Sequence, residues 1–213
     1  MLRLFDGTNL DPDLVSCCAL LGREGIPSHH YLIVQGTKLV ASNSGIAAQG
    51  TRDWALDSAS LELFQRNGLA VLSRVLAANI RTAFHEDVLD GLRIYARSSV
   101  ARDPSDKLIY TLVFLESLFV KNDSESLQDN IAHRIAFLLR SQREERRTII
   151  SQIKAAYALR SAFLHHGRGL EDMQALRAFM RIAFDVMFAL IANVDRFKST
   201  SEFHAAIDDE RLS

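Results

Sequence analysis

The chain has 213 residues, of which 48% are hydrophobic and 24% are charged, and its formal net charge is −1. This length suits one main domain around one hydrophobic core, and the balanced charge gives no bulk signal for nucleic-acid binding. No apolar run approaches the roughly 20 residues that cross a bilayer, so we expect no membrane helix. The first seven residues lack the pattern of a signal peptide, which favours a cytoplasmic protein.

The first 50 residues contain turn signals and two β-type segments. The segment at residues 30–34 is followed by Gln35-Gly36-Thr37 and by a second segment at residues 38–41, a pattern that predicts a β-hairpin. After residue 50 the pattern becomes helical, so we place a boundary near Thr51. The predicted organisation is a small β-hairpin-containing N-terminal element at residues 1–50 and a helical domain at residues 51–213.

From residue 51 onward, apolar residues recur at three- and four-residue spacing, which is typical of amphipathic helices. Asp103-Pro104 marks a helix start, because proline is tolerated in the first turn, and the apolar helix after it belongs in the core. The sequence therefore predicts a mainly α helical bundle with a small N-terminal β-containing element. The predicted helices span residues 56–80 with a break near Asn67-Gly68, 86–100, 104–120, 124–140, 143–165 and 171–197, followed by a short helix around Phe203 and Ile207.

Two charged residues fall on apolar stripes of these helices. Glu116 is flanked by apolar residues, and burying its carboxylate is costly unless a cation pairs with it. Arg160 lies on the packed stripe of helix 143–165 and needs a partner for the same reason. Arg134, on helix 124–140, also lies among apolar residues. The sequence leaves Arg134 and Arg160 open as partners of Glu116.

Basic residues are concentrated in the second half of the chain. Between Arg134 and Arg181 there are ten Lys or Arg residues against four Asp or Glu residues. The run Arg143-Glu144-Glu145-Arg146-Arg147 is typical of a solvated helix start with local ion pairs, and RNA contact is the alternative interpretation. The adjacent Cys17 and Cys18 suit neither a structural disulfide nor a zinc site, so we interpret them as small buried residues and expect no metal or cofactor.

The predicted helix at residues 143–165 ends within the run Tyr157-Ala158-Leu159-Arg160-Ser161-Ala162-Phe163-Leu164-His165-His166-Gly167. An ordinary helix end needs only a glycine and one cation, so one arginine and two histidines exceed that need. Arginine binds phosphate bidentately and stays charged, whereas histidine exchanges protons near neutral pH. This combination suits cleavage of a phosphodiester without a metal ion.

Arg160 and His165 do not lie side by side in a continuous helix, since five residues correspond to about 140° of rotation and about 7.5 Å of rise. Their side chains converge if the helix end unwinds, which Gly167 permits, or if a second copy of the helix faces the first across a two-fold axis. The second arrangement needs no strain and predicts a symmetric homodimer.

The run from Tyr157 to Gly167 resembles the signature of HEPN domains, in particular the ApeA-like branch, whose pattern is roughly Y-x-x-R-S/N-x-x-x-H-G. Phe114-Leu115-Glu116-Ser117-Leu118-Phe119 resembles the L-E-x-L-F motif of that branch, and Ala132-His133-Arg134-Ile135-Ala136 lies where its helix carries an arginine. The likeness extends over residues 86–211. This chain departs from the pattern with two histidines before the glycine, and the spacing from Arg160 favours His165.

The resemblance implies an all-α bundle that dimerises and places the Arg and His residues of both protomers in one cleft. Active members of the family are metal-independent ribonucleases, often in toxin–antitoxin or antiviral defence systems. By position, Arg160 and His165 would be catalytic. The residues that would orient Arg160 or line the cleft are Glu116, Arg134, Tyr157, Ser161 and His166.

Two functions of different classes follow from the sequence. We expect a metal-independent endoribonuclease that acts on RNA as a homodimer, leaves a cyclic phosphate and has an antitoxin or a sensor as a partner. The alternative is a catalytically silent HEPN module that dimerises or binds RNA or a nucleotide for a larger system. An open cleft shared by Arg160 and His165 would favour the enzyme, and an Arg160 locked to Glu116 without solvent access would favour the module. In a third interpretation, the chain is the C-terminal part of a longer protein that carries a sensing domain.

Overall fold

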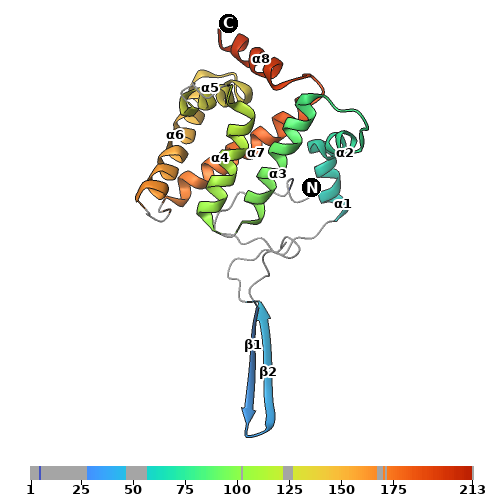
Figure 1. The fold of residues 1–213 in the computed structure, drawn as a ribbon, viewed down its shortest axis with the longest axis vertical. Coiled ribbons are helices and arrows are strands. Elements are labelled where there is room, and N and C mark those ends of the chain that lie inside the picture. The colour runs from blue at the N-terminus through green and yellow to red at the C-terminus, as the bar shows by residue number, and fades with distance from the viewer. Residues whose placement is uncertain are drawn as a thin grey trace.

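The computed structural model describes residue 5 and residues 28–46, 57–101, 103–121, 127–166, 170 and 172–212 (Figure 1). It confirms the mainly α fold with a small β element near the N-terminus. None of the described helices has the length and apolar character that crossing a membrane requires. The elements are β1 (Ser28–Gln35), β2 (Lys38–Ile46), α1 (Ser58–Phe64), η3 (Gln65–Leu69), α2 (Ala70–Ala77), α3 (Ala83–Val100), α4 (Pro104–Phe119), α5 (Leu127–Leu139), α6 (Arg143–His166), α7 (Met173–Asn193) and α8 (Thr200–Leu212).

Strands β1 and β2 form the predicted hairpin, an antiparallel pair that runs from Ser28 opposite Ile46 to Gln35 opposite Lys38. Gly36 lies in the turn with φ +60°, a left-handed backbone conformation that glycine adopts without a steric penalty. The hairpin extends away from the helices (Figure 1). Both strands are longer than the two predicted segments.

The N-terminal part of the chain also contributes to the helical core. The Phe5 ring is buried, with its centroid 5.9 Å from that of Phe64 on α1 and 5.8 Å from that of Phe188 on α7. This packing was not predicted, because a single aromatic residue carries no periodic signal. The predicted boundary near Thr51 and the two cysteines, Cys17 and Cys18, lie outside the described residues.

The predicted helix start and helix break are both present. Pro104 occupies the first turn of α4, and the Asp103 carboxylate accepts the backbone N–H of Ser105 at 2.6 Å, which caps the helix. The break near Asn67-Gly68 is the short π-helix η3, in which Gly68 has φ +104°. A Cβ atom at Gly68 would lie 2.7 Å from the Ile191 side chain, so this position lets α7 pack closely against η3.

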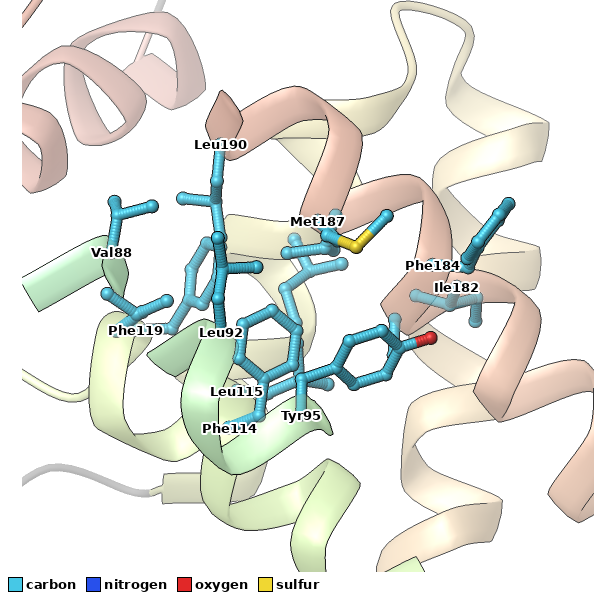
Figure 2. Close-up of a cluster of buried hydrophobic side chains, with 14 of the residues drawn as sticks. Val88, Leu92, Tyr95, Phe114, Leu115, Phe119, Ile182, Phe184, Met187 and Leu190 are labelled. Carbon is cyan, nitrogen blue, oxygen red and sulfur yellow. The ribbon is translucent and has the colours of Figure 1, made fainter. Parts of the chain in front are cut away.

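Helices α3, α4 and α7 meet at the centre of the bundle, as Figure 2 shows. Leu108, Leu112 and Leu115 of α4 are at most 1% exposed, which confirms that this helix belongs in the core. Each large apolar side chain buried in this way stabilises the fold by roughly 1.5–3 kcal/mol relative to an exposed one. The side chains labelled in Figure 2 are Val88, Leu92, Tyr95, Phe114, Leu115, Phe119, Ile182, Phe184, Met187 and Leu190.

Candidate active site

The candidate site lies where α6 meets α4. Tyr157 and Arg160 are three residues apart on α6, so they share one face of the helix. The Tyr157 hydroxyl donates a hydrogen bond to Oε1 of Glu116 at 3.0 Å, and Nη1 of Arg160 donates to the same oxygen at 2.9 Å. Two α6 side chains thus converge on one carboxylate oxygen of α4.

Burial and charge both act on this cluster. The Glu116 side chain is 21% exposed and that of Arg160 is 35% exposed. Burial raises the pKa of the Tyr157 hydroxyl, and the negative charge of Glu116 raises it further. Tyr157 is therefore a neutral hydrogen-bond donor at physiological pH. Arg160 is paired with Glu116 but remains accessible to solvent. The pairing therefore does not by itself decide between the enzyme and the silent module.

Arg134 does not join this cluster. It donates from Nη1 to the Phe119 carbonyl at 2.7 Å and from Nε to the Asp208 carboxylate at 3.3 Å. Of the two partners left open for Glu116, Arg160 is correct and Arg134 is wrong, because the buried Arg134 guanidinium connects the end of α4 to α8 instead. Asp208 was missed by sequence reasoning, since an acidic residue on the polar helix α8 carries no local signal of its partner.

The two histidines belong to the last turn of α6. The structure describes their backbone, which is helical through His166, whereas the side chains of His165 and His166 lie outside the described part. Because the helix continues past Arg160 without unwinding, the backbone at His165 is rotated by about 140° from Arg160. The helical backbone therefore places Arg160 and His165 at different angles around the axis of α6. Gly167 lies outside the described residues.

Exposed, uncharged side chains follow the same helical stripes as Glu116 and Arg160. Val113 and Ser117 are exposed on α4, next to Glu116 in the helix, and Ser161 and Leu164 follow Arg160 on α6. Val113 is 38% exposed and Leu164 is 56% exposed, which is high for large apolar residues. We call these four residues the α4/α6 face. Ser161, which was expected to line a cleft, lies on this face.

The charged run at the start of α6 has the predicted local pairing. Nη1 of Arg147 lies 3.0 Å from the Glu144 carboxylate, and the Arg146 guanidinium lies 3.8 Å from the centroid of the Phe137 ring. Exposed pairs of this kind contribute a few tenths of a kcal/mol. Among the described residues, no three His, Cys, Asp or Glu side chains are grouped as metal ligands.

Comparison of the chain with protein-family models, with curated proteins and with solved structures gives no match. The assignment of function therefore depends on the geometry of the Glu116–Tyr157–Arg160 cluster and on the residues that follow it along α6.

Proposed function

We propose that this protein is a metal-independent endoribonuclease of a defence or toxin-type system, in which Arg160 and His165 are the catalytic residues. The observation that carries the proposal is the placement of Arg160. Its guanidinium is held by Glu116 at the junction of α4 and α6, yet its side chain remains 35% exposed. It lies on a helix that ends with two histidines.

The chemistry assigns a different role to each residue. Among its described neighbours, Arg160 is hydrogen-bonded through Nη1 to Glu116, which leaves further guanidinium donors for a phosphate. A neutral His165 removes the proton from a ribose 2′-hydroxyl, and that oxygen attacks the adjacent phosphorus. The bond between phosphorus and the 5′-oxygen breaks, water protonates the departing 5′-oxygen, and the products are a 2′,3′-cyclic phosphate and a free 5′-hydroxyl. Arg160 stabilises the negative charge that develops on the phosphorus oxygens.

A homodimer brings the two residues together in this proposal. Five residues of helical backbone place Arg160 and His165 about 140° apart around the α6 axis, and in this proposal a second copy of the helix supplies the facing residue. The α4/α6 face supports this arrangement, because its exposed side chains are uncharged and include the apolar Val113 and Leu164. An interface there would place both copies of Arg160 along one seam, where a strand of RNA binds.

A second candidate function is a catalytically silent module that dimerises or binds RNA or a nucleotide within a larger system. The observation in its favour is that Tyr157 and Arg160 both bond the same oxygen of Glu116. A half-buried carboxylate needs such partners whether or not the protein is an enzyme. In this role, an antitoxin or a sensor protein would be the partner that the module serves.

Cleavage of end-labelled single-stranded RNA in EDTA separates the two functions. We expect the wild-type protein to cut, and Arg160→Ala and His165→Ala to lose at least a hundredfold in rate, because each removes a group that acts on the reacting phosphate. Arg93→Ala is the matched control, since Arg93 is an exposed arginine of α3 that pairs locally with Asp90. Dimerisation of every variant is measured by light scattering. Intact dimers with no cutting by the wild type would contradict the enzyme and favour the module.

A further inference from the structure

A second polar site lies at the other end of α6, away from the Glu116 cluster. A cavity of about 270 Å³ opens between α6 and α7 beside the end of α5. Its apolar lining comes from Ile149, Ala178 and Ile182, and the two isoleucines are at most 6% exposed. Cavities for drug-sized ligands measure roughly 300–1,000 Å³, so this one suits a smaller molecule.

Two carboxylates at one end of the cavity share a single cation. Nη2 of Arg140 donates to Asp185 at 3.2 Å, and Nε of the same guanidinium lies 3.9 Å from the Glu145 carboxylate. All three side chains line the cavity. With two negative charges against one positive charge, this end of the cavity carries a surplus negative charge.

The remaining charged residue of the lining is Arg181. It lies one helical turn from Asp185 on α7 and is exposed, and within the described part of the chain it forms no ion pair or hydrogen bond. The amide of Gln152, across the cavity on α6, is likewise without a partner among the described residues. Arg181 and Gln152 are therefore donors that remain available to an anionic group.

We propose that this cavity binds a small zwitterion of the α-amino acid class with an apolar side chain. The carboxylate of the ligand binds Arg181 and Gln152, and its ammonium group binds the carboxylates of Asp185 and Glu145. The side chain packs on Ile149 and Ile182. A simple anion would face the two carboxylates and a simple cation would face Arg181, so a dipolar ligand matches both ends.

Calorimetric titration of the full chain tests this assignment with L-leucine and two derivatives that each lack one charge. N-acetyl-L-leucine keeps the carboxylate and lacks the ammonium group, and L-leucinamide keeps the ammonium group and lacks the carboxylate. We expect L-leucine to bind and each derivative to bind at least tenfold more weakly. The proposal is overturned if L-leucine and the other apolar amino acids fail to bind at about 10 mM, or if N-acetyl-L-leucine binds as tightly as L-leucine.

Two substitutions test which residues bind the carboxylate and which bind the ammonium group of the ligand. Arg181→Gln should weaken L-leucine at least tenfold and leave the weak binding of L-leucinamide unchanged, whereas Glu145→Gln should weaken both. Arg181 is exposed and unpaired among the described residues, so its replacement does not threaten folding. Arg143→Gln is the control, because Arg143 is an exposed arginine of α6 that does not line the cavity. Unchanged L-leucine binding by Arg181→Gln would overturn the assignment.

Discussion

Glu116 positions Arg160 through a single carboxylate oxygen, and Tyr157 bonds the same oxygen. The raised pKa of the Tyr157 hydroxyl keeps the proton on this donor. At the scale of one residue, the candidate site is thus a carboxylate with two fixed donors. The hydrogen bond from Nη1 to Glu116 fixes the orientation of the Arg160 guanidinium, including the donors that do not bond Glu116.

Replacing Tyr157 with Phe should lower the free energy of unfolding by about 1 kcal/mol, because it removes one hydrogen bond to a charged group and keeps the ring. Urea denaturation measures this change. Tyr110→Phe is the matched control, since Tyr110 lies half-buried on α4 and forms no hydrogen bond with the described residues. We expect it to change stability by less than about 0.5 kcal/mol. Equal effects of the two substitutions would contradict the role given to the Tyr157 hydroxyl.

At Tyr95, the substitution of tyrosine by phenylalanine should raise the free energy of unfolding instead of lowering it. Its side chain is 1% exposed, and its hydroxyl has no hydrogen-bond partner in the described part of the protein. Figure 2 shows that hydroxyl directed toward the α7 segment that carries Ile182 and Phe184. Because a buried, unpaired hydroxyl costs about 1–3 kcal/mol, Tyr95→Phe should raise the unfolding free energy by about 1 kcal/mol. A loss of stability in urea denaturation would show that the hydroxyl has a bonding partner in solution.

At the scale of the elements, local signals predicted most helices and the hairpin, since caps, turn residues and apolar spacing act within a few residues. The start at Asp103-Pro104 and the break at Gly68 are examples. The choice between Arg134 and Arg160 as the partner of Glu116 could not be made in this way. The choice depends on which helix packs against α4 and on which of its residues lies opposite Glu116. Packing between segments that are distant in the sequence decides both. The packing of Phe5 on α1 and α7 was hidden for the same reason.

Gly68 determines how closely η3 approaches α7, and Gly68→Ala should destabilise the fold by about 3 kcal/mol. The alanine would have to adopt a positive φ and would place its Cβ atom 2.7 Å from Ile191, which adds overpacking to backbone strain. Gly36→Ala is the matched control, because Gly36 also has a positive φ but no atom lies within 4 Å of the added Cβ. Thermal unfolding should show a clearly smaller effect for Gly36→Ala, and equal effects would contradict the close approach.

At the scale of the whole molecule, the bundle has a candidate site at each end of α6. The Glu116 cluster lies beside the α4/α6 face, and the cavity between α6 and α7 contains Arg181. The proposed nuclease requires the Glu116 cluster and a second protomer. The proposed amino-acid site is complete within one chain. A substitution that abolishes RNA cleavage should therefore leave amino-acid binding intact, and the two proposals can be tested separately.

In the proposed nuclease, one catalytic site combines Arg160 of one protomer with His165 of its partner. Mixing protomers tests it directly, with Arg160→Ala and His165→Ala chains unfolded together, refolded and assayed on labelled RNA in EDTA. Each single variant should be inactive. The mixture should recover about a quarter of the wild-type rate, because half of the dimers are mixed and one of their two sites keeps both residues. A mixture as inactive as its components, in the presence of confirmed mixed dimers, would contradict a site shared between protomers.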